Sequence, residues 1–357
     1  MEISIKNFGT IKSAKVKIGG LTVIAGENDS GKSTIGKILF SIVKAFSRIE
    51  DELVENKNSR IFDICESIYF TLRRNISLNL NSEIRKHFIP PRFTDNIQVH
   101  GEDAIYERKK HLDYLLNNEE INENIFKEIA DKLEKIKYII SEDEDPKEVI
   151  RNAVRRAFYS EFKGEIASKS TNENATVEVN DGATRLIKLE WNKSELFNLD
   201  LNDDISFDDV TYFESAATIQ FHHFIQVART LFDNNQSRNR DLMVPLHIKD
   251  LSKKLHDSMY NLGLNESENL SEFKDIYEGD FYFDRDSSQF ILQRENYKIN
   301  SGNVASGIKN LGVFDMLVQG NHVNSKTLTI IDEPEGNLHP DWQGKYAKAI
   351  TMVASKG

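Results

Sequence analysis

Apolar and polar residues alternate along the first part of the chain, and their spacing changes twice within it. Residues 3–18 alternate as two short strands would, and the glycine pair 19–20 then turns the chain into the apolar run 21–25. A continuous apolar run of this kind is typical of a strand buried on both faces. Over residues 35–43 the apolar positions take helical spacing. This pattern predicts a hairpin, a buried central strand, a glycine-bearing loop and a helix.

Residues 45–169 differ, because long charged segments carry their apolar residues at helical spacing. One apolar stripe covers 125–140, and a second covers 149–162. Between them, Asp145 and Pro146 form a typical helix start, with a capping carboxylate and a proline in the first turn. We interpret this block as a helical insertion without a catalytic role.

Strand patterns return near residue 175. Two alternating runs, 175–179 and 186–191, flank an Asn-Asp-Gly turn and predict a hairpin. Helical spacing prevails over 217–265. Alternating aromatic residues over 282–292 indicate a further short hairpin, and we interpret their rings as core rather than as a platform for stacking bases.

Together these patterns predict an α/β fold. Strands at both ends of the chain bracket the helical block. We therefore expect one discontinuous domain, residues 1–44 and 170–357, with the helical insertion 45–169 between its two parts.

The composition fits a folded chain without surplus positive charge. Of 357 residues, 39% are hydrophobic and 29% are charged, which disfavours global disorder. The formal net charge is −11, so the chain lacks the broad positive surface of a dedicated nucleic-acid-binding protein. A local basic patch remains compatible with this charge.

The single cysteine, Cys65, excludes an internal disulfide and a structural zinc site built from cysteines. We interpret it as a small buried residue on a helix. No apolar run approaches the roughly 18 residues that a membrane span needs, and the amino terminus lacks the apolar core of a signal peptide. We therefore expect a cytoplasmic protein.

The clearest chemical motif is a phosphate-binding loop. Residues 26–33 match the pattern G-x-x-x-x-G-K-[ST] in full, between the expected strand and helix. Its glycines let backbone N–H groups surround phosphates, and the helix start adds positive partial charge. We expect Lys32 to reach the β- and γ-phosphates and Ser33 to ligate Mg²⁺. The residues expected to bind ATP are Asn28, Asp29, Ser30, Gly31, Lys32, Ser33 and Thr34.

A second motif lies near the other end of the chain, where the apolar run 328–331 ends in Asp332 and Glu333. An α/β sheet places its ligand chemistry at the carboxyl ends of its strands. We expect Asp332 to hold Mg²⁺ and Glu333 to polarise the attacking water as a general base. Alone this signal is weak, and it gains its meaning from the phosphate loop.

With both motifs, the chain resembles the ABC-type ATPase heads of the SMC, RecF and OLD-nuclease group. It looks closest to the AAA family ATPases of bacterial defence systems, such as the ATPase subunit of Septu-type systems. The stretches that carry the resemblance are residues 5–9, 25–34, 303–309 and 331–340. The resemblance implies a P-loop NTPase fold with a mainly parallel core sheet, an antiparallel β-subdomain and helical insertions. It also implies a head-to-tail homodimer that closes over two ATP molecules.

The resemblance assigns a further role to Ser306 and Gly307, the signature that meets the γ-phosphate held by the partner subunit. We expect Ser306 to cap the following helix. The usual L-S-G-G-Q wording is absent, and the usual serine falls on Ala305, so an ordinary Ser-Gly helix start is the alternative. Gln220 is a candidate for the magnesium-contacting glutamine. For His339, a structural hydrogen bond is favoured over catalysis.

One departure from the family concerns the end of the chain. The resemblance implies a strand and a switch histidine after the helix expected over 342–353, and neither follows here. Two interpretations follow: the chain is a fragment of a longer one, or another element closes its sheet. We favour the fragment.

The two motifs thus predict an ATPase that uses ATP and Mg²⁺. The resemblance implies that it works as a dimeric switch for a partner, a nuclease in anti-phage defence. The first alternative is a DNA-binding head of the recombination and repair type. Its patch would be built from Arg73-Arg74, Arg85-Lys86 and Arg155-Arg156. The second alternative is a nucleotide-binding scaffold with little turnover.

Overall fold

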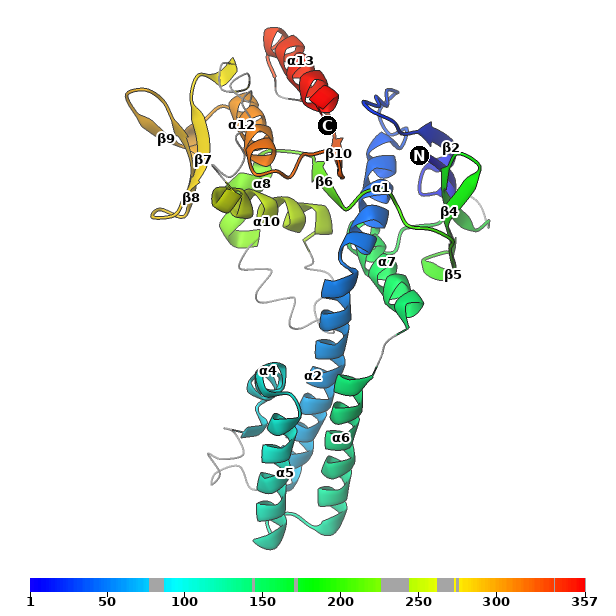
Figure 1. Cartoon of the computed structure of the whole chain (residues 1–357), viewed down its shortest axis with the longest axis vertical. Coiled ribbons are helices and arrows are strands. Elements are labelled where there is room, and N and C mark those ends of the chain that lie inside the picture. Colours follow the sequence, from blue (N-terminus) through cyan, green and yellow to red (C-terminus); the bar gives the residue numbers. More distant parts are fainter. Residues whose placement is uncertain are drawn as a thin grey trace. The chain divides into compact units, whose positions relative to one another are not determined.

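The computed structural model describes residues 1–76, 87–142, 145–169, 173–225, 244–261, 273, 276–336 and 338–356. The chain forms two compact units. The first unit comprises Met1–Ser47 and Arg151–Gly357, and the second comprises Arg48–Ile150 (Figure 1).

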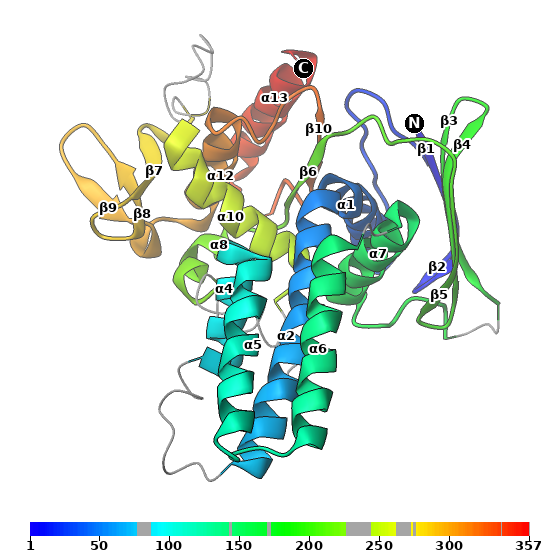
Figure 2. The same cartoon turned by 60° about the horizontal axis from the view of Figure 1, so that its bottom comes forward.

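The second unit is helical, and it falls inside the 45–169 range expected from the sequence. Helices of this unit run side by side (Figure 2). The apolar stripe expected over 125–140 is confirmed, since Ile129, Leu133 and Ile136 are buried in the core of this unit. Cys65 is buried in the same core, as expected. The helices of this unit are α2 (Ile49–Asn75), α4 (Pro90–His100), α5 (Glu102–Asn117) and α6 (Glu123–Ser141).

A five-stranded antiparallel sheet in the first unit contains both hairpins expected from the alternating patterns. Its strands lie in the order β2-β1-β3-β4-β5. Their bounds are β1 (Glu2–Phe8), β2 (Ile11–Lys17), β3 (Ala175–Asp181), β4 (Thr184–Asn192) and β5 (Glu195–Leu201).

Helix α7 (Pro146–Phe162) begins as expected, because the Lys147 N–H donates to Asp145 Oδ1 at 3.0 Å. From Arg151 onward α7 belongs to the first unit and packs on the five-stranded sheet. The rings of Phe158 and Trp191 lie 4.7 Å apart between centroids.

The parallel part of the fold is small. Strand β6 (Asp209–Phe213) pairs in parallel with β10 (Thr327–Ile331), and this is the single parallel pair among the described residues. The expectation of a mainly parallel core sheet is therefore met only by these two strands. Helix α1 (Lys32–Ser47) follows the phosphate loop and packs on them.

The expectation of a buried strand over 21–25 is wrong. These residues form no strand, and the side chains of Leu21 and Val23 are 51% and 81% exposed. An apolar run becomes a buried strand only where ladder partners flank it and other elements cover it. No described strand pairs with this run.

The remaining elements of the first unit form a second apolar core. The hairpin expected over 282–292 is confirmed, and Phe283 and Phe290 are buried in that core, as interpreted. Residues 226–243 and 262–265 of the expected helical stretch lie outside the described residues. The elements are α8 (Ala217–Gln220), α10 (Leu246–Asn261), β7 (Asp280–Asp284), β8 (Gln289–Gln293), β9 (Lys298–Asn300), α12 (Ser306–Gln319) and α13 (Pro340–Lys356).

Among the described helices, none combines the length and the apolar character that crossing a membrane requires.

Candidate functional site

The phosphate loop is shaped by residues with left-handed backbone. Gly31 has φ 91°, and a Cβ at this position would lie 2.6 Å from Cγ1 of Ile11, so no larger residue fits without movement. Asp29 also has a positive φ, of 62°. The loop therefore packs closely against the turn between β1 and β2.

Helix α1 presents its free N–H groups to this loop. Its first intrahelical bond runs from the Ile35 N–H to the Gly31 carbonyl, at 3.0 Å. The N–H groups of Lys32, Ser33 and Thr34 precede that bond and have no partner within the helix. The first turn contains no acidic side chain that would offset the positive helix end. This arrangement favours an anion at the loop.

Lys32 lies across the loop. Its ammonium donates to the carbonyl oxygens of Gly26 and Glu27, at 2.8 and 2.6 Å. These bonds hold one positive charge beside the start of α1, where the sequence motif predicts that the phosphates bind.

The two sequence motifs meet at the end of β10. Ser33 Oγ donates to Asp332 Oδ1 at 3.1 Å, although the residues are 299 positions apart. The Asp332 N–H donates to the Phe213 carbonyl at 2.9 Å, which continues the β6–β10 ladder by one bond. The first turn of α1 and the carboxyl end of β10 therefore present a hydroxyl and a carboxylate to one place.

A third residue, which the sequence reasoning missed, completes this contact. Tyr212 is buried on β6, and its hydroxyl donates to Asp332 Oδ2 at 2.9 Å. Burial raises the pKa of Tyr212, and the charge of Asp332 raises it further, so the phenol keeps its proton and remains a donor. No motif in the sequence identifies this residue.

Glu333, the expected general base, has an exposed side chain and an unusual backbone. Its φ is 47°, in the left-handed region that non-glycine residues rarely adopt. Its carbonyl accepts the Gly336 N–H at 2.8 Å, which closes a turn directly after β10. Backbone strain of this kind is often found at functional sites.

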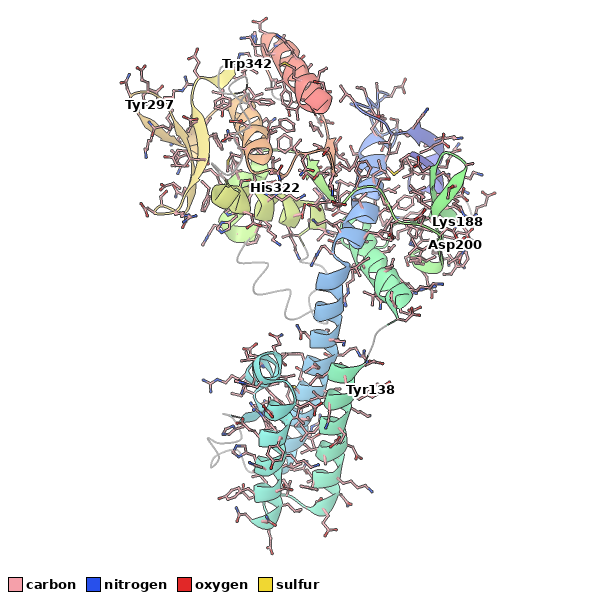
Figure 3. All side chains as sticks on the ribbon, in the orientation of Figure 1. Tyr138, Lys188, Asp200, Tyr297, His322 and Trp342 are labelled. Carbon is pink, nitrogen blue, oxygen red and sulfur yellow. The ribbon has the colours of Figure 1, made fainter. Side chains whose placement is uncertain are left out.

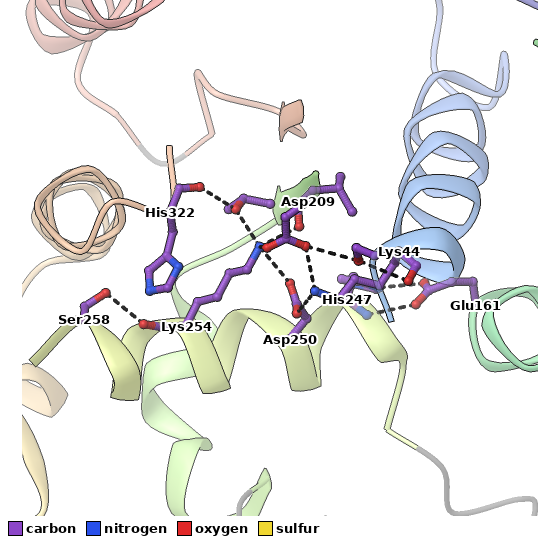
Figure 4. A network of polar contacts seen from close by, with 11 residues as sticks. Lys44, Glu161, Asp209, His247, Asp250, Lys254, Ser258 and His322 are labelled. Atoms are coloured by element: carbon purple, nitrogen blue, oxygen red, sulfur yellow. Dashed lines mark hydrogen bonds and ion pairs between the residues drawn. The ribbon is translucent and has the colours of Figure 1, made fainter. Parts of the chain in front are cut away.

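A second carboxylate follows β6 as Asp332 follows β10. Glu214 Oε2 lies 2.9 Å from His247 Nε2. Glu161 Oε2 lies 2.6 Å from His247 Nδ1 (Figure 4). The bond from His247 and the charge of Lys37, 3.6 Å away, lower the pKa of Glu214 to about 2. Burial opposes protonation of His247, but its bonds to the two carboxylates raise its pKa overall. These residues come from distant segments, and no sequence pattern joins them.

Four charged side chains connect α1, β6 and α10 near the last turn of α1, at its end away from the phosphate loop (Figure 4). We call this group the four-charge cluster, and it consists of Lys44, Asp209, Asp250 and Lys254. Lys44 Nζ lies 2.8 Å from Asp209 and 2.6 Å from Asp250. Lys254 Nζ lies 2.8 Å from Asp209 and 3.3 Å from Asp250. The cluster fixes the far end of the phosphate-loop helix.

Ser306 and Gly307 begin α12, but the expected cap is wrong. Ala305 occupies the N-cap position and no side chain caps the helix, because Ser306 already has helical backbone. One turn further, buried Asn310 accepts the Ala216 N–H and donates to the Gly336 carbonyl, both at 3.1 Å. This links α12 to the turn after Glu333. Within the described residues, no hydrogen bond joins Ser306 or Gly307 to residues 26–34.

The remaining candidates lie elsewhere. Gln220 is exposed at the end of α8, and the residue directly after β6 is Glu214. The Asp341 N–H donates to Nδ1 of His339 at 3.4 Å, a local bond at the start of α13.

Of the basic pairs, Arg73 and Arg74 are exposed on α2, and Arg155 donates to the Leu196 carbonyl at 3.2 Å. Arg85 and Lys86 lie outside the described residues. The described residues contain no group of three or more His, Cys, Asp and Glu side chains suited to a metal ion.

Residues 1–357 match the protein family described as AAA ATPase domain, so the match spans both compact units. No curated protein matches the chain.

Proposed function

We propose that this chain, which belongs to the AAA ATPase domain family, binds ATP together with Mg²⁺ and hydrolyses it. The observation that carries the proposal is the bond from Ser33 to Asp332, beside the lysine of the phosphate loop. A hydroxyl and a carboxylate are hard oxygen ligands. Magnesium sites typically use one or two protein carboxylates together with substrate phosphates. This donor set therefore fits a magnesium–nucleotide complex.

Each residue has a separate task in this proposal. The N–H groups at the start of α1 bind the phosphates, and Lys32 exchanges its two loop carbonyls for phosphate oxygens. Ser33 and Asp332 hold Mg²⁺, which when bound offsets the charge on the phosphates. Glu333 accepts the proton of the attacking water, and its side chain is exposed on a turn with left-handed backbone.

We further propose that ATP closes a head-to-tail dimer, in which Ser306 and Gly307 meet the γ-phosphate of the partner subunit. The support is the bond from Asn310 to Gly336, because it joins the start of α12 to the turn that carries Glu333. The partner controlled by this switch would be a nuclease in anti-phage defence. The support for that partner is the resemblance of residues 25–34 and 331–340 to ATPases of defence systems.

The variant Glu333→Gln tests the dimer, because it keeps the shape of the side chain and removes its ability to accept a proton. Its molar mass is measured by light scattering with saturating Mg·ATP and, separately, with Mg·ADP. We expect a dimer with ATP and a monomer with ADP. Lys32→Ala in the same background should remain monomeric with both nucleotides. A Glu333→Gln protein that stays monomeric with ATP, although it binds the nucleotide, contradicts the dimer.

A further inference from the structure

Strands β6 and β10 direct a row of side chains toward α1. Side chains alternate along a strand, so residues two positions apart share a face. Tyr212 and Ile330 lie on the face that meets Gly36 of α1, and Asp332 lies two residues beyond Ile330 on the same face. The row therefore ends at the contact with Ser33, one turn before Gly36 on α1.

The two oxygens of Asp332 have different partners. Oδ1 accepts from Ser33 on α1, and Oδ2 accepts from the Tyr212 hydroxyl on the neighbouring strand. A carboxylate held at one oxygen cannot rotate freely about its last bond. The Tyr212 bond thus directs Oδ1 toward α1, and it also takes up the oxygen that a metal would not use.

We infer that Tyr212 is a positioning residue for the metal: its hydroxyl holds Asp332 by Oδ2 and keeps Oδ1 directed toward Ser33 and Mg²⁺. The inference rests on the proposed function, since it assumes that Ser33 and Asp332 hold Mg²⁺. Groups that hydrogen-bond a metal's carboxylate ligand fix its orientation, and their loss commonly weakens metal binding by 10-fold or more.

Gly36 gives Tyr212 the space for this bond. A Cβ on Gly36 would lie 3.1 Å from Cε2 of Tyr212, 3.2 Å from Cγ2 of Ile330 and 3.5 Å from the Tyr212 hydroxyl oxygen. The first two distances are tighter than ordinary van der Waals contact, so a methyl group here would displace the ring. Gly36→Ala therefore disturbs the Tyr212–Asp332 bond without touching either residue's chemistry.

A second buried tyrosine provides a matched control. Tyr277 donates to Asp315 Oδ2 at 2.6 Å, and both residues are buried in the apolar core around α12. Tyr277→Phe removes the same kind of phenol–carboxylate bond from the same unit. It should lower stability as Tyr212→Phe does, and it should leave metal binding unchanged.

The experiment measures two affinities by calorimetry with a non-hydrolysable ATP analogue. The first is the affinity for the analogue in EDTA, and the second is the affinity of the protein–analogue complex for Mg²⁺. For Tyr212→Phe we expect the first to stay unchanged and the second to fall by about tenfold. Gly36→Ala should shift the second in the same direction, and Gly36→Ala with Tyr212→Phe should add little to Tyr212→Phe alone.

One result would contradict the positioning role of Tyr212, and another would contradict the proposed function. If Tyr212→Phe keeps the wild-type affinity for Mg²⁺ while its melting temperature falls with that of Tyr277→Phe, the hydroxyl is structural and the inference is wrong. If the wild-type protein binds the analogue no better with Mg²⁺ than in EDTA, the proposed function itself is wrong. Asp332→Asn separates the cases, because it should lose the Mg²⁺ effect wherever the wild type shows one.

Discussion

Because Asp209 belongs to the four-charge cluster, removing its charge should clearly lower the stability of the first unit. In the variant Asp209→Asn the side chain keeps its shape and loses its charge. Two ammonium groups, Lys44 and Lys254, then face the single carboxylate of Asp250. Their side chains are only 10% and 6% exposed, so water can compensate them little.

The size of the effect follows from the burial of the two lysines and from the pKa of Asp209. Removing one partner of a buried ion pair costs about 3–5 kcal/mol, and partial exposure of Asp209 reduces this figure. The pKa of Asp209 leads to a similar figure. Burial alone would raise it, but Lys254 and Lys44 outweigh burial and lower it from 3.8 to about 2. At about 1.4 kcal/mol per unit, this corresponds to roughly 2 kcal/mol after screening by solvent is allowed for. We therefore expect a loss of about 2–3 kcal/mol.

The pH dependence gives the same prediction a second readout. The pKa of Asp209 is lower in the folded protein than its ordinary value of 3.8. Its contribution to stability is therefore present above about pH 4 and is lost as the pH falls toward 2. Asp209→Asn should lack this part of the loss, so its stability should approach that of the wild type in this range.

The assay is urea unfolding followed by tryptophan fluorescence. Both tryptophans, Trp191 and Trp342, belong to the unit that contains the cluster, and Trp191 is fully buried. Asp200→Asn is the matched control. Asp200 lies on β5 (Figure 3). It pairs with Arg185 of β4, and both side chains are exposed, so this ion pair contributes at most about 1 kcal/mol. Two results would contradict the stabilising role of Asp209. One is that Asp209→Asn destabilises the protein no more than Asp200→Asn does, and the other is that both variants lose stability equally between pH 4 and 2.

Two further predictions concern the backbone of the site. In Gly31→Ala, the new Cβ would have to accept a φ of 91° and lie 2.6 Å from Ile11. The variant should lose at least about 1–2 kcal/mol of stability and bind ATP more weakly in a calorimetric titration. Wild-type affinity would show that the loop tolerates a side chain there. Glu333→Asn should abolish turnover. Its stability should equal that of the wild type or exceed it by up to about 1 kcal/mol, because asparagine tolerates the left-handed φ of 47° better than glutamate does. A clear loss in melting temperature would refute the strain at this turn.

The sequence predicted best what depends on neighbouring residues. Alternation over 3–18 and 175–191 gave the right hairpins, since the period of two and the turn residues are local properties. The two motifs predicted that Ser33 and Asp332 serve one Mg²⁺ ion, and their side chains do lie in hydrogen-bond contact although 299 positions separate them.

Predictions that depended on distant partners failed or were never made. The run 21–25 has the composition of a buried strand, but burial needs flanking strands and none is described. The predicted N-cap, Ser306, lies one residue after the actual N-cap, Ala305, because the cap position depends on where the backbone becomes helical. Tyr212 and His247 had no motif, since their roles arise only when β6, α10 and α7 come together.

The central claim is that the phosphate loop and the acid end of β10 form one ATP-hydrolysing site. Its most direct test is steady-state phosphate release with Mg·ATP, for the wild type beside Lys32→Ala and Asp332→Asn. Lys15→Ala, an exposed lysine on β2, is the control for loss of a charge. We predict turnover for the wild type and Lys15→Ala, and none for the other two variants. Turnover that persists in Lys32→Ala and Asp332→Asn, or no turnover and no ATP binding in the wild type, would contradict the claim.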